Sequence, residues 1–319
     1  MKLQIYRTNV SSYQNTQFLS QEKRILEEIP GVKYIQSLQD IGDEPFALIS
    51  NTHTRPQEVP KNILDKTILM IHPNSGHDNI PDSFLRESNF PVVVGNPIRA
   101  NAVCEYTLSC IFQHFTKIPQ HQYWPSTRNW ERRLLRDQRV LIIGHGHIGS
   151  LLHQSLSPLC REVISYDPKF ENNEPTLINQ WSDDLFDGVN ILIIAASLNE
   201  SSENLIGISH LKKLNPQNLI INPARAEILS EKDLTSYLLK NPKSFCFLDV
   251  FNKEPFEPGH LNEVKNLNKT AHIAGVYDRL NKDIISFEYL IIKDFLDSYE
   301  KDDITSFKNE YQDCIINLN

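Results

Sequence analysis

The sequence predicts an α/β protein with two doubly wound domains, each built around a parallel sheet. Its 319 residues correspond to about two average domains, and its hydrophobic content of 40% is enough for two cores. Short apolar runs alternate with amphipathic stretches along most of the chain, which is typical of alternating strands and helices. One such run leads into a glycine-rich turn and begins a second series, so we expect two domains.

The first hundred residues predict one domain of this kind. A helical pattern that includes Phe18 and ends near Leu26 follows the first apolar run. The expected strands are residues 3–6, 46–49, 67–71 and 91–94. A further helical pattern, 103–115, leads to a polar and aromatic segment around Pro125, which we expect to connect the two domains.

The run Arg139–Ile143 predicts a buried parallel strand, because it is aliphatic and too short for a helix. It continues into the pattern G-x-G-x-x-G, formed by Gly144, Gly146 and Gly149. In a dinucleotide site these glycines permit a tight turn, a close approach to a pyrophosphate, and close packing of the next helix. That helix would begin at His147 and Ile148, with its first N–H groups toward the phosphates. Its apolar face would carry Ile148, Leu151, Leu152, Leu156 and Leu159.

A second strand, Val163–Tyr166, ends at Asp167. This acid follows the glycines by about 20 residues, the place from which a carboxylate binds the ribose 2′-hydroxyl of NAD. Strand, glycines, helix, strand and acid together predict a Rossmann domain that binds NAD. The charge of Asp167 would repel a 2′-phosphate and so favours NAD over NADP, while nearby Lys169 weakens that preference.

The alternation continues toward the end of the chain. Further strands are expected at residues 189–194, 219–221 and 245–248. An amphipathic helical pattern from Ile284 to Leu296 is expected to pack against the first domain. We therefore predict a Rossmann NAD-binding domain, residues 106–285, inserted in a flavodoxin-like substrate domain, residues 1–105 plus 286–319.

Three polar stretches occur where later strands should end, which is the edge at which open α/β sheets bind ligands. Arg225 offers a planar fork of donors suited to a carboxylate. His272 can exchange a proton near neutral pH, and Glu254 beside it would hold its tautomer and raise its pKa. Alone, each has an ordinary alternative as a surface charge, a structural histidine or a turn residue. Their order behind a dinucleotide loop favours redox chemistry on a 2-oxo or 2-hydroxy acid.

With these motifs, most of the chain resembles the D-isomer-specific 2-hydroxyacid dehydrogenase family. Asn74–Ile80 is similar to the family's glycine turn, whose backbone N–H groups hold the substrate carboxylate, and this implies that role for Ser75 and Gly76. Asn96–Glu105 is similar to the start of the interdomain helix, and Trp130 to the tryptophan before the cofactor domain.

The later motifs match the same family. Asn222-Pro223-Ala224-Arg225 resembles the motif of the catalytic arginine, and His272-Ile273-Ala274-Gly275 that of the catalytic histidine. Asp249 and Glu254 resemble the aspartate that contacts the carboxamide and the glutamate that supports the histidine. The resemblance implies cofactor contacts from Gly144, Gly146, His147, Ile148, Gly149, Asp167, Pro223, Ala224, Arg225, Asp249, His272 and Gly275.

The implied reaction is hydride transfer between nicotinamide and C2 of a D-2-hydroxy acid or 2-oxo acid. His272, paired with Glu254, would give its proton to the substrate oxygen, while Arg225 and the Ser75-Gly76 backbone fix the carboxylate. The resemblance also implies a homodimer. Several positions depart from the family pattern and affect the shape of the pocket: Ala226, Ala271, Ala196-Ser197-Leu198 and Pro97-Ile98-Arg99-Ala100.

Two alternatives remain open at this stage. One is a non-enzymatic, corepressor-like protein that binds NAD(H). The other, within the enzymes, is a phosphorylated hydroxy acid as substrate, with Arg55 or Arg99 as the candidate contact to its tail.

Composition limits the remaining functions. The formal charge of −8 and the lack of a sustained basic face argue against nucleic acid and anionic membranes as partners. An arginine cluster between residues 128 and 139 is interpreted as a solvated connector, with a phosphate patch as the alternative. Five scattered cysteines and the absence of a signal-peptide pattern favour the reducing cytoplasm. His145 and His147 suggest a metal, but no further ligands have metal-site spacing, so no metal is expected.

Overall fold

The structure, a computed structural model, describes residues 2–116, 118, 120–127, 132–171 and 174–317. These residues form two compact units. Unit 1 comprises the chain up to Arg99 and from Tyr277 onward, and unit 2 comprises Ala100–Val276. The predicted boundaries, 105/106 and 285/286, lie a few residues later in the chain. One local cause is Tyr277, whose hydroxyl lies 2.9 Å from the carbonyl oxygen of Ile98 and so belongs with unit 1.

Unit 1 contains a parallel sheet in the order β2-β1-β3-β4-β5. Its strands are β1 (Leu3–Arg7), β2 (Val32–Tyr34), β3 (Phe46–Ile49), β4 (Thr67–His72) and β5 (Val92–Val94). This strand order is that of flavodoxin-like folds, as predicted. All four residues of β3 are buried, because helices cover both faces of the sheet.

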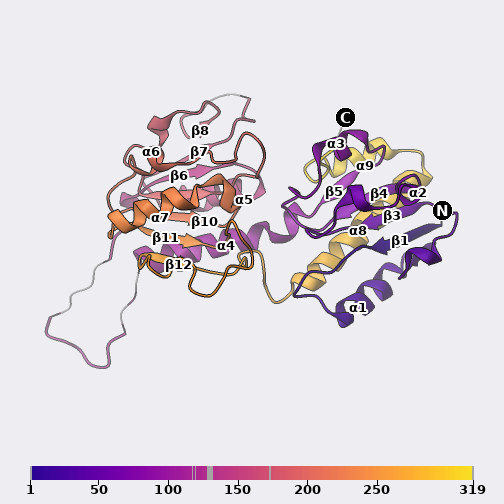
Figure 1. Cartoon of the computed structure of the whole chain (residues 1–319), viewed down its shortest axis with the longest axis horizontal. Helices are drawn as coiled ribbons and strands as arrows, with labels where there is room; N and C mark the ends of the chain where they lie inside the picture. The colour runs from indigo at the N-terminus through magenta and orange to yellow at the C-terminus, as the bar shows by residue number, and fades with distance from the viewer. Residues whose placement is uncertain (1, 117, 119, 128–131, 172–173, 318–319) are drawn as a thin grey trace. The chain divides into compact units, whose positions relative to one another are not determined.

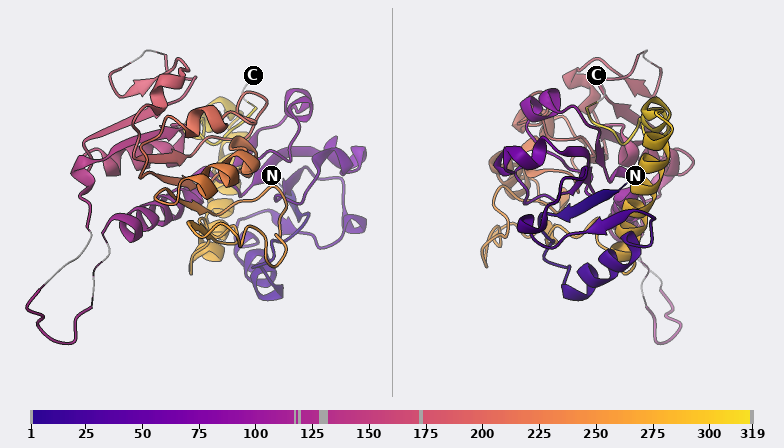
Figure 2. Two further views of the ribbon diagram at one scale, coloured as in Figure 1. Left: turned by 60° about the vertical axis from the view of Figure 1, so that its left-hand side comes forward. Right: turned by 90° about the vertical axis from the view of Figure 1, so that its right-hand side faces the viewer.

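The helices of unit 1 come from both ends of the chain. They are α1 (Thr16–Leu26), α2 (Lys61–Leu64), α3 (Asp82–Glu87), α8 (Leu280–Glu300) and α9 (Ile304–Glu310). Residues of α1, α8 and α9 pack on one face of the sheet, and residues of α2 and α3 on the other. Figure 2 shows α8, in yellow, running along this sheet. The late amphipathic pattern therefore does pack against the first domain, as expected.

The C-terminal segment of the described chain also pairs with the sheet. Val93 of β5 forms an antiparallel bridge with Ile315. The N–H of Val94 donates to the carbonyl of Cys314, and the N–H of Ile316 donates to the carbonyl of Val92. Unit 1 is thus completed by residues that lie more than 200 positions later in the sequence, as the Asn317–Val92 hydrogen bond also illustrates.

Unit 2 contains a parallel sheet in the order β12-β11-β10-β9-β6-β7-β8. Its strands are β6 (Arg139–Ile143), β7 (Glu162–Tyr166), β8 (Leu177–Ile178), β9 (Ile191–Ile194), β10 (Leu219–Asn222), β11 (Phe245–Leu248) and β12 (Leu267–Lys269). The order outward from β6 is that of a Rossmann sheet with one further strand, and it places β6 beside β9, where the order reverses. Such a reversal is where doubly wound sheets bind their ligands.

Helices cover both faces of this second sheet. They are α4 (Asn96–Phe115), whose first residues belong to unit 1, and α5 (His147–Leu156), α6 (Ile208–Leu211) and α7 (Glu231–Lys240). Residues of α4 and α5 pack on one face, and residues of α6 and α7 on the other (Figure 1). Short 3-10 turns occur at Leu38–Asp40, Pro56–Glu58, Leu135–Asp137, Asp183–Phe186 and Ala226–Ile228.

A buried ionic network joins β1, α1, β2 and α8 in unit 1. Arg7 donates from Nε to Glu22 at 2.7 Å and also contacts Glu288. The hydroxyl of Tyr34 donates to the second oxygen of Glu22 at 2.5 Å. Arg7 and both carboxylates are almost completely inaccessible to solvent. Burial, together with the negative charge of Glu22, raises the pKa of the Glu288 carboxyl well above its ordinary value, although Arg7 opposes the shift.

Some sequence predictions were wrong in detail. Leu159 lies beyond the end of α5 and is 41% exposed, so it does not belong to that helix's apolar face. The helical pattern at residues 103–115 covers only the later part of α4, which begins at Asn96, as the resemblance of Asn96–Glu105 to the start of the interdomain helix implies. The short strands β2, β8 and β12 and the helix α9 were not predicted.

The connector before β6 is only partly described. Trp130 and Arg128, the first arginine of the cluster between residues 128 and 139, lie outside the described residues. Arg133 donates to the carbonyl of Gln217 and stacks over the ring of Phe115, and Arg139 pairs with Glu162 at 2.7 Å. Arg133 therefore fastens the segment before β6 to α4 and to the residues before β10, while Arg139 is engaged within the sheet of unit 2.

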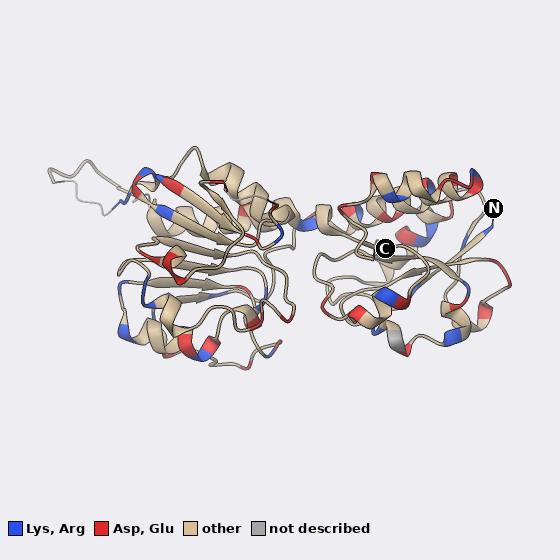
Figure 3. Cartoon of the chain, turned by 90° about the horizontal axis from the view of Figure 1, so that it is seen from above, with Lys and Arg blue, Asp and Glu red and all other residues tan. Residues whose placement is uncertain are grey.

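Charges of both signs are interspersed along the described elements of each unit, as Figure 3 shows. Among the helices of the described chain, none combines the length and the apolar character that crossing a membrane requires.

Candidate active site

The glycine turn after β6 has three glycines with three different requirements. Gly144 has a φ of +96°, and a Cβ there would lie 2.6 Å from the backbone of Ala196. A Cβ on Gly149 would lie 2.0 Å from the carbonyl oxygen of Gly144. Gly146 differs, because a Cβ there would meet no described atom within 4 Å. The fold therefore needs Gly144 and Gly149, while the open space at Gly146 fits a ligand that approaches the backbone.

The helix that follows adds donors to this space. Helix α5 begins at His147 with Gly146 as its N-cap, and the first N–H groups of a helix have no partner within it. Such a terminus binds phosphate groups through these N–H groups and the helix dipole. The turn, with His147 and Ile148 at its end, thus fits the pyrophosphate of a dinucleotide.

Asp167, at the end of β7, is brought beside this turn. One carboxylate oxygen accepts the N–H of His145 at 2.8 Å, and the other accepts the N–H of Lys169 at 3.0 Å. Each oxygen retains a further lone pair, so the carboxylate can also accept a ribose hydroxyl. The contact to His145 fixes the acid next to the phosphate-binding turn.

His145 lies in a small aromatic group within the turn. Its ring contacts those of His153 and Phe170 with centroids 5.3 and 5.0 Å away. Burial lowers the pKa of His145, although Asp167 opposes the shift, so the imidazole is neutral at physiological pH. Within the described chain, no three His, Cys, Asp or Glu side chains gather as a metal site would require.

Replacing Gly146 by alanine should separate cofactor binding from folding. Because the added methyl meets no described atom, we expect the free energy of unfolding to change by less than about 0.5 kcal/mol. A dinucleotide that approaches this backbone would meet the methyl, and NADH affinity should fall by about tenfold or more, equivalent to about 1.4 kcal/mol. Fluorescence titration with NADH measures the affinity, and thermal unfolding measures the stability. Gly149→Ala is the control, since it should lower stability directly; equal NADH affinity for wild type and Gly146→Ala would contradict the assignment.

The turn after β10 positions Arg225. Asn222, fully buried at the end of this strand, donates from Nδ2 to the carbonyl of Arg225 at 2.9 Å. Its Oδ1 accepts the N–H of Ala224 at 3.1 Å, so one side chain closes the turn around Pro223. The guanidinium of Arg225 donates to the carbonyl of Ala224 at 2.8 Å and is partly accessible to solvent.

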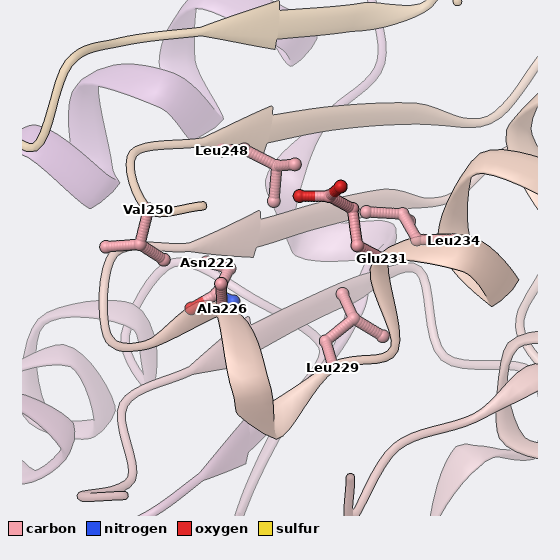
Figure 4. A pocket seen from close by; sticks show the side chains of 7 residues that line it. All are labelled: Asn222, Ala226, Leu229, Glu231, Leu234, Leu248 and Val250. Atoms are coloured by element: carbon pink, nitrogen blue, oxygen red, sulfur yellow. The ribbon is translucent and has the colours of Figure 1, made fainter. Parts of the chain in front are cut away.

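Ala226, where the family pattern has glycine, is accommodated without strain. It begins a 3-10 turn, so its backbone needs no conformation reserved for glycine. Its methyl group faces a cavity of about 10 Å³, large enough for about one water molecule. Figure 4 shows the lining residues, which are Asn222, Ala226, Leu229, Glu231, Leu234, Leu248 and Val250. This cavity lies next to the residues that hold the Arg225 turn, and it is too small for a substrate.

Asp249, at the end of β11, organises the segment that carries His272. Its carboxylate is fully buried and accepts the N–H groups of Ile273 and Ala274, each at 2.8 Å, and the hydroxyl of Thr270 at 2.6 Å. Its backbone carbonyl accepts the N–H of His272 at 2.8 Å. In the structure, Asp249 therefore holds the segment of His272 through these hydrogen bonds. A contact between Asp249 and the carboxamide of a cofactor remains a prediction.

His272 and Glu254 form a direct pair. Nδ1 of His272 donates to Oε2 of Glu254 at 2.7 Å, and Oε1 of Glu254 accepts the N–H of Phe251 at 2.9 Å. Burial alone would raise the pKa of the Glu254 carboxyl, but these hydrogen bonds and the positive charges of His272 and Arg225 lower it below its ordinary value. The side chain of His272 is 50% exposed. The structure thus brings Arg225, Glu254 and His272 together at the carboxyl edge of the unit 2 sheet.

Ser75 and Gly76 lie in the loop between β4 and α3 of unit 1. The imidazole of His72 bridges the Ser50 hydroxyl and the carbonyl of Gly76, both at 2.9 Å. Asn79 donates to two carbonyls of the loop after β3, which fixes the turn from the other side. Among the described residues, the N–H groups of Ser75 and Gly76 meet no acceptor, and the buried hydroxyl of Ser75 has no partner. These donors have the chemistry to bind a carboxylate, and that role for Ser75 and Gly76 stays a prediction.

Sequence reasoning missed Asn222, Thr270 and Tyr106 as supporting residues. Asn222 is the first residue of the predicted arginine motif and Thr270 lies two residues before His272, which was the available signal. The hydroxyl of Tyr106 lies 2.7 Å from that of Thr270, although the two residues are 164 positions apart, and nothing in the sequence links them.

Known proteins share these features. The family model described as "D-isomer specific 2-hydroxyacid dehydrogenase, NAD binding domain" matches residues 108–274. An erythronate-4-phosphate dehydrogenase of Blochmanniella floridana is 30% identical over 207 residues, 63% of this chain and 52% of that protein. An (S)-sulfolactate dehydrogenase of Chromohalobacter salexigens is 27% identical over 66% of this chain and 71% of its own. The match to the erythronate-4-phosphate dehydrogenases spans only about half their length.

Solved structures agree over nearly the whole chain. NAD+-bound 3-phosphoglycerate dehydrogenase of Entamoeba histolytica has a TM-score of 0.71 at 19% identity, covering 93% of this chain and 96% of its own. D-Lactate dehydrogenase of Aquifex aeolicus, solved with NAD and lactic acid, has a TM-score of 0.70 at 14% identity, covering 99% of both chains. At these identities the likeness shows the fold, with two α/β domains.

Proposed function

Because the chain belongs to the D-isomer-specific 2-hydroxyacid dehydrogenase family, we propose that it is an NAD-dependent oxidoreductase acting on a small 2-hydroxy or 2-oxo acid. The observation that carries this proposal is the 2.7 Å pair of His272 and Glu254 on the sheet edge that also bears Arg225. A site that only bound a dinucleotide would need the glycine turn and Asp167, but no proton donor held by a carboxylate.

In the proposed mechanism, the glycine turn and Asp167 hold NADH, which supplies the hydride when bound. Arg225 is the proposed residue of unit 2 that binds and orients the substrate carboxylate. Glu254 occupies Nδ1 of His272, so Nε2 is the nitrogen that donates a proton to the C2 oxygen in reduction and accepts it in oxidation. The lowered pKa of Glu254 keeps its carboxylate ionised at neutral pH, so it remains a hydrogen-bond acceptor for Nδ1 of His272.

A panel of 2-oxo acids with NADH, followed by loss of absorbance, tests this function. We expect turnover with at least one acid and weaker turnover with NADPH, because Asp167 would face the 2′-phosphate. Equal rates with both cofactors would contradict the cofactor preference. Saturable NADH binding without turnover on any acid would instead favour the corepressor-like alternative.

A phosphorylated hydroxy acid is the second candidate substrate, and Arg99 is the observation that favours it. Its guanidinium donates to Asn74 at 3.2 Å, next to Ser75, and stacks on the ring of Tyr13. These contacts fix a cation beside the carboxylate-binding turn, whereas Arg55 has a 69% exposed side chain that contacts Glu58 at 3.7 Å. The panel should therefore include pairs of acids with and without a phosphate, and a lower KM for the phosphorylated members would support this candidate.

A homodimer in the cytoplasm is the proposed state of the protein. Ile118, Tyr123 and Trp124 are 86%, 78% and 81% exposed on the segment between α4 and β6. Large apolar side chains gathered on one segment mark an interaction surface, and a second copy of the chain would cover it. Light scattering on the purified protein measures the mass. The reducing compartment is supported by five free cysteines, four of them buried.

A further inference from the structure

A chain of partly buried hydroxyl groups reaches from helix α4 to the segment of His272. The hydroxyl of Tyr106 lies 2.7 Å from that of Thr270, and the hydroxyl of Thr270 lies 2.6 Å from Oδ1 of Asp249. These three residues come from α4, from the end of β12 and from the end of β11. Beyond Asp249, the chain continues to the backbone N–H groups of Ile273 and Ala274.

The direction of each hydrogen bond follows from the groups involved. Both oxygens of Asp249 act as acceptors, each for a backbone N–H group. The hydroxyl of Thr270 has one hydrogen, which it must donate to Asp249. Tyr106 is therefore the donor to Thr270. Burial raises the pKa of the Tyr106 hydroxyl, so it keeps this hydrogen throughout the physiological range.

The end of this chain fixes an uncommon backbone conformation. His272 has a φ of +53°, a left-handed conformation that a residue with a side chain keeps only where its surroundings enforce it. Asp249 restrains the backbone on both sides of His272. Its carboxylate accepts the hydroxyl of Thr270 before the histidine and the N–H groups of Ile273 and Ala274 after it. The orientation of the Asp249 carboxylate depends in turn on Thr270 and Tyr106.

We propose that Tyr106 is a positioning residue for His272 and acts through Thr270 and Asp249. The proposal rests on the proposed function, in which His272 is the proton donor. Tyr106 itself contacts neither His272 nor Glu254 in the described hydrogen bonds, so its effect reaches the imidazole only through the two intermediate residues.

The test compares Tyr106→Phe with Tyr237→Phe in the full chain. Tyr237 is a buried tyrosine of the same unit whose hydroxyl bonds Asn218 and Ser244, away from the His272 segment, so it controls for the loss of a buried hydroxyl. Two quantities are measured: kcat and KM with a 2-oxo acid and NADH, and the ¹⁵N chemical shifts of the His272 imidazole by NMR without substrate. Thr270→Val and Thr270→Ser extend the comparison, because serine keeps the hydroxyl.

We expect Tyr106→Phe to lower kcat by about three- to tenfold, the size of one lost hydrogen bond, with the Kd for NADH within about twofold of wild type. The His272 resonances should shift or broaden in Tyr106→Phe and Thr270→Val, and should return in Thr270→Ser. Unchanged resonances in Tyr106→Phe, or equal changes in Tyr237→Phe, would overturn the proposal. If the wild type shows no turnover, the proposed function fails, while the resonances still decide whether Tyr106 positions the imidazole.

Discussion

Replacing His272 by alanine is expected to lower turnover by about 10² to 10⁴, the usual contribution of a well-placed general acid. The imidazole is the group whose Nδ1 lies 2.7 Å from Glu254, and the side chain of His272 is 50% exposed. NADH affinity should change little, because the glycine turn and Asp167 do not depend on this side chain. Steady-state rates and an NADH fluorescence titration on the same preparation provide both quantities.

His260→Ala is the matched control for this variant. His260 also pairs with a glutamate of unit 2, Glu231, at 3.3 Å, but it lies outside the proposed machinery. Its removal should leave turnover within about twofold of wild type, since a partly exposed ion pair contributes little. Turnover of His272→Ala equal to that of wild type would rule out the mechanism, whatever the effect on NADH binding.

Replacing Arg7 by alanine should destabilise unit 1 by about 3–5 kcal/mol, because it leaves the buried carboxylate of Glu22 without its cation. Arg7 also stacks 5.2 Å from the centre of the Phe18 ring, so packing is lost as well. Hydrogen exchange measured by mass spectrometry should show faster exchange in β1, α1 and α8, with little change in unit 2. Arg24→Ala, an exposed arginine on the same helix α1, is the control; comparable effects of the two variants would contradict this account.

The pH dependence of the same network has a definite sign. The pKa of Glu288 is raised in the folded protein above its ordinary value of 4.5, so above pH 4.5 the folded state holds more protons than the unfolded one. The contribution of this group to stability is complete below pH 4.5 and is lost as pH rises toward the folded pKa. Glu288→Gln cannot lose a proton, so its stability relative to wild type should increase with pH over that window. If the difference in stability between Glu288→Gln and wild type stays constant over this pH range, Glu288 is already ionised in the folded protein and the account is wrong.

The sequence was sufficient to predict a strand where several consecutive residues are apolar. Strands β3, β6 and β11 are continuous apolar runs, and the structure places each of them in the centre of a core. Strands β2 and β8 have three and two residues and lie at or near the sheet edges, where partial exposure removes the apolar pattern. Helix α9 was missed because only Phe307 is buried in it.

The candidate site divides in the same way. Arg225 and Glu254 follow strands that the apolar pattern predicts, β10 and β11, whereas His272 follows the short strand β12, whose residues were not predicted. Because parallel strands deliver their carboxyl ends to one edge, the meeting of Arg225 and Glu254 was predictable. The contacts of Tyr106 and the role of Asp249 in holding the His272 segment depend on which turn faces which helix. No local pattern encodes that, because a hydroxyl group gives the same sequence signal with or without a buried partner.

The discontinuous construction of unit 1 has a consequence for the order in which the protein folds during its synthesis. Domains generally fold as they leave the ribosome, the earliest first. Here the first strands to emerge, β1 to β5, lack α8 and the segment that bridges Val93 to Ile315 until nearly all of the described chain has been made. Unit 2 is continuous in sequence, so it can fold while one face of the unit 1 sheet is still not covered by α8 and α9. The later domain is therefore expected to fold before the earlier one, and ribosome-bound chains of increasing length, probed by limited proteolysis, would reveal that reversed order.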